Sequence, residues 1–136
     1  MAAGTVVLWR HGRTGFNAAR RFQGQLDIDL DAVGREQVAA SAAVLARLRP
    51  AAVVASDLLR AAATAKALAE RTGLPLELDA GLREVDVPAG EGLGNDEVAA
   101  RWPQEHAAWR RGEDVPMGGG ERRSEAGARA AAAVER

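Results

Sequence analysis

Blocks of apolar and polar positions alternate along the chain and predict strands and helices in turn. Residues 5–9 form a short apolar, β-branched run that ends abruptly in polar residues, which predicts a buried strand followed by a loop. Residues 34–48 repeat apolar side chains along one helical face, and Pro50 ends the pattern. Residues 51–55 predict a second buried strand, and residues 58–71 predict a second helix. This order predicts the α/β fold class, in which helices connect strands.

The spacing of these elements predicts a βαβ crossover. The strands at 5–9 and 51–55 are expected to be parallel neighbours, with the intervening helix packed on one face. Ser56 and Asp57 are expected to cap the helix that follows the second strand. Residues 76–78 are expected to add a third, short strand.

The second half of the chain has a looser pattern. Beyond Gly81 we expect a loop, followed by short helices at 96–101 and 104–110. The glycines at 118–120 predict a flexible break, and residues 121–136 predict an alanine-rich helix. Because another strand would come next in this alternation, we expect the chain to end within a longer fold.

Composition narrows the class of protein. The chain has 136 residues, enough for one domain, and its 47% hydrophobic and 27% charged residues are typical of a globular protein. Its net charge of -1 gives no electrostatic reason to expect a nucleic acid or a membrane surface as partner. No run approaches the roughly 18 apolar residues of a membrane helix. Residues 1–4 are uncharged, so no secretion signal is expected. The lack of cysteine excludes disulfides and thiolate metal sites and fits a cytoplasmic location.

Three basic side chains follow the first two predicted strands. Arg10 and His11 leave the first strand, and Arg60 lies just beyond the second. Because ligands of an open parallel sheet collect at the carboxyl ends of its strands, we expect these residues around one point. Guanidinium groups and a helix N-terminus suit a phosphate, and a neutral imidazole nitrogen can attack phosphorus. The alternative, a histidine that merely caps a strand, is weakened by the two arginines.

Five segments in chain order carry further signals. They are residues 8–17 (LWRHGRTGFN), 21–27 (RFQGQLD) with Leu30 and Gly34, 56–61 (SDLLRA) with Thr64 and Ala65, 82–84 (LRE) with 91–93 (EGL), and 119–121 (GGE) with Arg129. Together these segments resemble the motifs of the histidine phosphatase superfamily, in its phosphoglycerate mutase-like branch. The resemblance covers essentially the whole chain.

The resemblance implies a fold and a chemistry. The fold would be a three-layer sandwich around a mostly parallel sheet. His11 would be the nucleophile that becomes phosphohistidine, and Glu84 would donate a proton to the leaving oxygen. Taken alone, Glu84 could equally be a solvated loop carboxylate. The family's reaction needs no metal and no cofactor.

The resemblance also implies a set of binding residues. Arg10 and Arg60 would clamp the phosphate, and Asn17 would be a further phosphate contact. Gln23 and Gly24 fall where the family's substrate-side loop lies. Arginine is heavily used throughout this chain, so other arginines near the site are weaker candidates.

One part of the family's pattern is missing. The superfamily completes its phosphate pocket with a second histidine on a strand after the last predicted helix, and nothing in this chain matches it. His106, on an expected surface helix, is in the wrong motif. Residues 1–136 are therefore expected to be the N-terminal portion of a single histidine phosphatase domain and to be impaired alone.

Three functions fit these observations. The first is hydrolysis of a small phosphorylated metabolite, because residues 11–14 and 23–24 look more like the phosphatase members than the mutases. The second is a mutase that transfers the phosphoryl group to a phosphoglycerate. The third is a non-catalytic module that binds a phosphorylated ligand, which the intact pair of His11 and Glu84 disfavours. The sequence leaves the oligomeric state open, with a homodimer as one candidate.

Overall fold

The computed structural model describes residues 4–135. Residues 1–3, where no secretion signal is expected, and Arg136, at the end of the expected last helix, lie outside the described residues. The elements in chain order are α1 (Gly15–Ala18), α2 (Ala32–Leu45), η1 (Ala46–Leu48), β1 (Val53–Ala55), α3 (Leu59–Thr72), β2 (Leu76–Leu78), η2 (Ala80–Leu82), η3 (Pro88–Gly90), α4 (Asn95–Arg101), α5 (Pro103–Arg110), η4 (Met117–Gly119) and α6 (Arg123–Glu135).

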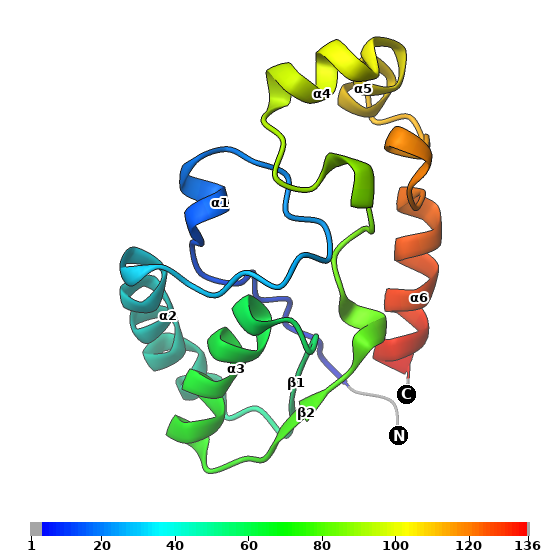
Figure 1. Cartoon of the computed structure of the whole chain (residues 1–136). Coiled ribbons are helices and arrows are strands. Elements are labelled where there is room, and N and C mark those ends of the chain that lie inside the picture. The colour runs from blue at the N-terminus through cyan, green and yellow to red at the C-terminus, as the bar shows by residue number, and fades with distance from the viewer. Residues whose placement is uncertain (1–3, 136) are drawn as a thin grey trace.

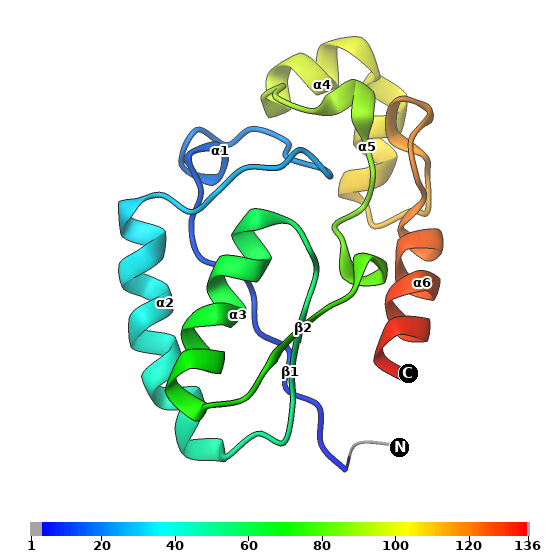
Figure 2. The ribbon, with the colours of Figure 1, turned by 60° about the horizontal axis from the view of Figure 1, so that its bottom comes forward.

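The sheet of the described chain is a parallel pair joined by a helix. β1 pairs with β2, with Val53 opposite Leu76 and Ala55 opposite Leu78, and α3 makes the crossover. Figure 2 shows α2 and α3 on one side of this pair and α6 on the other. The predicted α/β class and the third short strand are therefore confirmed.

The predicted strand at residues 5–9 is wrong. These residues are described but form no strand, and the side chains of Val6, Val7 and Leu8 are 52%, 55% and 87% exposed. Only Trp9, at the end of the run, packs against the core. An apolar run becomes a strand only when another strand offers it a ladder of hydrogen bonds, and the run itself does not reveal that partner.

Two apolar clusters hold the molecule together. The first core lies between α2, α3 and the strands and consists of the buried residues Ala42, Val53, Ala55, Ala65 and Leu68. The second core lies beside α4 and α5, in the upper part of Figure 1, and consists of the buried residues Val87, Val98 and Met117. The small side chains of the first core let α2 and α3 approach closely, so this half of the fold depends on tight packing of alanine.

The N-termini of α2 and α3 are capped in different ways. Asp31 caps α2 by accepting the N–H of Gly34 at 2.7 Å. The cap of α3 was expected from Ser56 and Asp57, but the N-cap position is Leu58, whose side chain cannot accept a hydrogen bond. The N–H of Leu59 instead donates to Oδ1 of Asp27, 32 residues earlier, at 2.7 Å.

The displaced cap residues have other contacts. Oγ of Ser56 accepts the N–H of Leu58, and Asp57 binds the guanidinium of Arg83. An ion pair with an arginine from a distant loop thus replaces the expected local cap. Within residues 4–135, no helix has the length and the apolar character needed to cross a membrane.

Candidate active site

The segment that carries His11 lies directly on the first turn of α2. A Cβ atom added to Gly34 would lie 2.0 Å from the carbonyl oxygen of Arg13, and one added to Gly12 would lie 2.6 Å from the carbonyl oxygen of Gly34. Only glycine permits this approach of two backbones. The N–H of Gly12 also donates to Oγ1 of Thr64 in α3. The segment of His11 is thus fixed between α2 and α3.

The imidazole of His11 has a defined orientation. Its Nδ1 lies 2.7 Å from the carbonyl oxygen of Gly12. Because a carbonyl oxygen can only accept a hydrogen bond, Nδ1 must carry the proton, and the lone pair of neutral His11 is then on Nε2. The residue is half-buried, with Nε2 as its nucleophilic atom.

The charges around His11 come from three other side chains. Burial lowers the pKa of the His11 imidazole below its usual 6.5, and the hydrogen bond to Gly12 partly offsets this effect. The positive charges of Arg60 and Arg10 lower the same pKa further, while the carboxylate of Glu84 raises it. His11 therefore stays neutral near neutral pH, which is the form that can attack phosphorus.

Arg60 is a buried cation beside the histidine. Its residue surface is only 2% exposed, and its guanidinium donates to the carbonyl oxygens of Gly24 at 2.6 Å and of Leu26 at 2.7 Å. Gly24 has φ +51, a conformation that favours glycine and that turns its carbonyl towards the arginine. Burial lowers the pKa of Arg60, and the carboxylate of Glu84 opposes this shift. The loop at residues 24–26 therefore orients the guanidinium.

Glu84 reaches the site from the loop after η2. Its residue is exposed, and its Oε1 accepts the N–H of Val85 at 2.8 Å. Its charge acts on both His11 and Arg60. The structure thus brings together four of the residues expected from the sequence, Arg10 being the exposed neighbour of His11.

Asn17 and Gln23 gather around Thr14, which is fully buried. Thr14 caps α1, its Oγ1 accepting the N–H of Asn17 at 3.1 Å. The same hydroxyl lies 2.6 Å from Oε1 of Gln23. These contacts hold both amide side chains near the loop that leads away from His11. Their contact with a phosphate stays a prediction.

A surface hollow of about 380 Å³ adjoins His11 on the side of α2. Its lining residues are Trp9, Arg10, His11, Gly12, Gln37, Val38 and Ser41. Arg60 and Glu84 are not among them. Of the residues expected to form the site, Arg10 and His11 line this hollow. Within residues 4–135 no group of three or more His, Cys, Asp or Glu side chains could hold a metal ion.

Other sequence expectations have mixed outcomes. His106 lies in α5, as expected, but on its buried side, with 8% exposure. Trp102 and Trp109 pack against the second core. Arg83, one of the other arginines near the site, forms a two-bond ion pair with Asp57, with both distances at 2.6 Å.

Thr64, to which the sequence pattern assigned no role, connects the segment of His11 to Arg60. Its Oγ1 accepts the N–H of Gly12 at 3.1 Å and donates to the carbonyl oxygen of Arg60 at 2.7 Å. One hydroxyl therefore links the segment of His11 to the helix that carries Arg60. The only signal for it was its place in the segment that begins at Ser56.

The whole described chain has counterparts among known proteins. Residues 6–136 match the family model of the histidine phosphatase superfamily (branch 1). The chain is 48% identical to a glucosyl-3-phosphoglycerate phosphatase of Mycolicibacterium vanbaalenii over 105 residues, which cover 77% of this chain and 47% of that protein. It is 37% identical to a 2,3-bisphosphoglycerate-dependent phosphoglycerate mutase of Rhizobium etli over 133 residues, covering 93% of this chain and 63% of the mutase.

A solved structure has the same fold. It is a mycobacterial glucosyl-3-phosphoglycerate phosphatase in complex with VO3, with a TM-score of 0.86 and 41% sequence identity over 91% of this chain and 62% of that chain. The chain thus spans about half to two thirds of the length of these relatives. The expected architecture, helices around a parallel sheet, agrees with this neighbour.

Proposed function

Because the chain belongs to the histidine phosphatase superfamily, we propose that it provides the nucleophile, phosphate clamp and proton donor of a phosphomonoester hydrolase. The observation that carries this proposal is the orientation of His11. Its Nδ1 is bound to the carbonyl of Gly12, which leaves Nε2 unprotonated among the charges of Arg60, Arg10 and Glu84. A neutral, oriented imidazole beside two cations and one carboxyl group suits phosphoryl transfer.

In the proposed reaction the lone pair of Nε2 of His11 attacks phosphorus, and the bond from phosphorus to the ester oxygen breaks. Glu84 gives its proton to that oxygen. Arg10 and Arg60 offset the negative charge on the phosphoryl oxygens, since the carbonyls of the Gly24–Gln25–Leu26 loop engage only two of the five N–H groups of Arg60. Water then attacks the phosphohistidine and passes a proton to Glu84. Inorganic phosphate leaves, and both side chains regain their first state.

The proposed substrate is a small phosphorylated metabolite. The similarity to the glucosyl-3-phosphoglycerate phosphatase of M. vanbaalenii makes a phosphorylated sugar-acid ester the first compound to test. The amide side chains of Asn17 and Gln23 would add contacts to the phosphate or to the rest of the substrate. Neither a metal nor a cofactor has a part in the proposed reaction.

A mutase activity is the second candidate, favoured by the 37% identity to the R. etli enzyme. It shares the phosphohistidine and differs only in the acceptor, which would be a phosphoglycerate in place of water. A module that binds a phosphorylated ligand without turnover is the third candidate. It has less support, because His11 and Glu84 are both present and electrostatically coupled.

Trapping of the phosphoenzyme tests the proposal. The protein is mixed with a radiolabelled aryl phosphate, quenched in alkali and analysed for label on histidine. We expect label on His11, release of inorganic phosphate, and loss of both in His11→Ala. His106→Gln is the matched control, because it alters the chain's other histidine, which lies in α5. Transfer of label to added phosphoglycerate would favour the mutase, and saturable binding without label or turnover would favour the binding module.

We also propose that residues 1–136 are the N-terminal portion of a single catalytic domain. The share of its relatives that the chain spans and the exposed apolar run Val6, Val7 and Leu8 support this proposal. An assay of this chain beside the longest form that its gene encodes would test it, and equal rates would contradict it. The cytoplasmic location and the homodimer stay predictions, which cell fractionation and sedimentation would check.

A further inference from the structure

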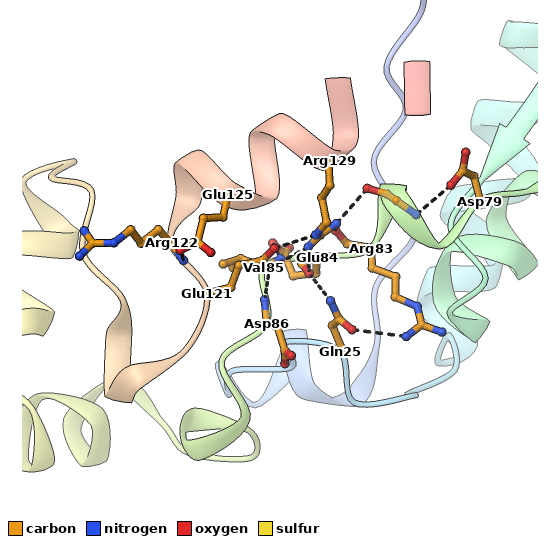
Figure 3. A network of polar contacts seen from close by, with 11 residues as sticks. Gln25, Asp79, Arg83, Glu84, Val85, Asp86, Glu121, Arg122, Glu125 and Arg129 are labelled. Carbon is orange, nitrogen blue, oxygen red and sulfur yellow. Dashed lines mark hydrogen bonds and ion pairs between the residues drawn. The ribbon is translucent and has the colours of Figure 1, made fainter. Parts of the chain in front are cut away.

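The loop that carries Glu84 is fastened to α6 by a single arginine (Figure 3). Nη1 of Arg129 donates to the carbonyl oxygens of Gly81 at 2.9 Å and of Arg83 at 2.5 Å. Nη2 donates to the carbonyl oxygen of Glu84 at 2.7 Å and to Oε2 of Glu121 at 2.9 Å. Nε donates to Oε1 of Glu121 at 2.8 Å. An arginine side chain has five N–H groups, so all donors of Arg129 are engaged.

Glu121 fastens the far end of the same loop. Its Oε2 accepts the N–H of Asp86 at 2.8 Å, and its own N–H donates to the carbonyl oxygen of Asp86 at 2.7 Å. Three carbonyls and both polar backbone groups of Asp86 are therefore bound by Arg129 and Glu121. These contacts all fall on six consecutive residues, 81–86, which include Glu84.

The pair is charged and partly shielded from water. The side chains of Arg129 and Glu121 are 25% and 17% exposed. Their mutual hydrogen bonds raise the pKa of Arg129 and lower the pKa of Glu121, so both stay ionised at neutral pH. A charged, two-bond pair of this geometry is more rigid than the exposed ion pairs elsewhere in the chain.

The side chain of Glu84, in contrast, has few contacts of its own. It is exposed, and its hydrogen bond goes to the neighbouring N–H of Val85. The place of its carboxyl group is therefore set mainly by its backbone. The carbonyl of Glu84 is held from two sides, by Arg129 and by Nε2 of Gln25 at 3.2 Å.

We propose that Arg129 and Glu121 are positioning residues, which hold the backbone of Glu84 so that its carboxyl group reaches the leaving oxygen. This inference rests on the proposed function, in which Glu84 is the proton donor. All donors of Arg129 are engaged with Glu121 and the loop, so the two residues act on the reaction through the backbone of Glu84. Their effect on the reaction is therefore confined to the step in which Glu84 delivers its proton.

Leaving groups of different basicity separate this role from a general structural one. An alkyl phosphate must lose an alkoxide, which needs the proton of Glu84 as the bond to phosphorus breaks. An activated aryl phosphate loses a stabilised phenolate, which departs without protonation. A misplaced proton donor therefore slows the first ester and spares the second, whereas a general loss of folded protein slows both equally.

The test compares single-turnover phosphorylation of His11 by the two esters, in the longest form of the protein that its gene encodes. In Arg129→Lys we expect the rate with the alkyl ester to fall by about 100-fold and the rate with the aryl ester by less than about threefold. Lysine keeps the charge but has only three donors at one point, so it cannot replace the five-bond arrangement. Arg123→Lys is the matched control, since Arg123 lies on the same helix but stacks over Trp109.

Glu121→Gln is the second variant, chosen in case Arg129→Lys does not fold. Its amide NH₂ would face the donors of Arg129 and Asp86, so we expect the same selective loss, about 10-fold, with the alkyl ester. Equal losses with both esters, or no loss with either, would overturn the positioning role while leaving the phosphohistidine intact. A wild-type protein that forms no phosphohistidine from either ester would overturn the proposed function, and the inference with it.

Discussion

Around His11 the backbone is fixed by close packing of buried groups, whereas around Glu84 it is fixed by ion pairs and hydrogen bonds that solvent reaches. In the first region Gly12 and Gly34 allow two backbones to touch, and the buried Thr64 joins them to α3. In the second region Arg129 and Glu121 supply the contacts. The backbone of His11, the proposed nucleophile, is therefore held by packing, and that of Glu84, the proposed proton donor, by charge.

This difference has a physical consequence for each region. Packed backbone does not respond to pH or salt, but it tolerates no added atom. Charged pairs tolerate small changes of shape, but they weaken when one partner is neutralised or screened. The ion pair of Asp57 with Arg83 connects the two regions, because Asp57 lies two residues before α3 and Arg83 directly precedes Glu84.

Gly34→Ala is expected to have the largest effect and would break the packed region. The new Cβ would lie 2.0 Å from the carbonyl oxygen of Arg13, which is backbone and cannot turn aside. We expect the free energy of unfolding to fall by about 3 kcal/mol or more, which exceeds the roughly 1 kcal/mol that alanine gains over glycine in a helix. Urea denaturation would measure it.

Gly127→Ala is the matched control for this variant. Gly127 also lies in a helix, α6, and a Cβ added there would meet no atom within 4 Å. Here the helical preference acts alone, so we expect stabilisation of about 0.5–1 kcal/mol. Similar free energies of unfolding for the two variants would contradict the description of the histidine segment as tightly packed.

Arg60→Ala is expected to have the next largest effect, because it removes a buried charged group on which the packed region depends. A buried hydrogen bond to the carbonyl of Gly24 and a partly buried one to the carbonyl of Leu26 would be lost, and neither carbonyl would gain an equivalent partner. We expect the free energy of unfolding to fall by about 3 kcal/mol. In the exposed Arg47→Ala the change should stay within about 0.5 kcal/mol. Equal changes in urea denaturation would show that Arg60 has no structural role.

The local parts of the fold could be predicted from the sequence. The strand 76–78 and the helix after Asp57 follow from short apolar patterns and stop signals, which depend only on neighbouring residues. Residues 5–9 have the same kind of pattern but form no strand, because a strand also needs a partner. Asp57 failed as a cap for a similar reason, since Arg83 competes for its carboxylate.

The proximity of His11 and Arg60 was predicted, but for a reason that the structure only partly supports. The expected reason was the common edge of two parallel strands, yet only one of those strands exists. The hydroxyl of Thr64 and the contact between Gly12 and Gly34 bring the residues together instead. The roles of Arg129 and Glu121 depend on contacts with residues far away in sequence, which no local pattern contains.

Glu121→Gln is expected to have a smaller effect on stability, and one that depends on pH. The hydrogen bonds from Arg129 lower the pKa of Glu121 from its usual 4.5, so the folded state binds the proton more weakly than the unfolded state. The carboxylate therefore stabilises the fold fully above pH 4.5, and this contribution is lost as pH falls through the lowered pKa. We expect a difference of about 1 kcal/mol between wild type and variant at neutral pH.

That difference should shrink steadily below pH 4.5. Urea denaturation at several pH values would measure it, with Gly34→Ala as the comparison, because a steric clash has no titrating group. If the difference in unfolding free energy between wild type and Glu121→Gln stays constant from neutral to acidic pH, charge does not stabilise the region around Glu84.

Asp27→Ala is expected to have the smallest effect, because it removes a surface carboxylate that supports the packed region. Its Oδ1 accepts the N–H of Leu59 at the start of α3, so the loop at 24–27 both orients Arg60 and caps the helix that carries it. We expect the alanine variant to lose about 1 kcal/mol of unfolding free energy and Asp27→Asn to lose only a few tenths, because an amide oxygen is an equally good cap. Glu36→Ala, an exposed carboxylate within α2, should change stability by less than about 0.5 kcal/mol. If Asp27→Ala behaves like Glu36→Ala in urea denaturation, the distant cap contributes nothing, and the packed region around Arg60 stands without help from surface charge.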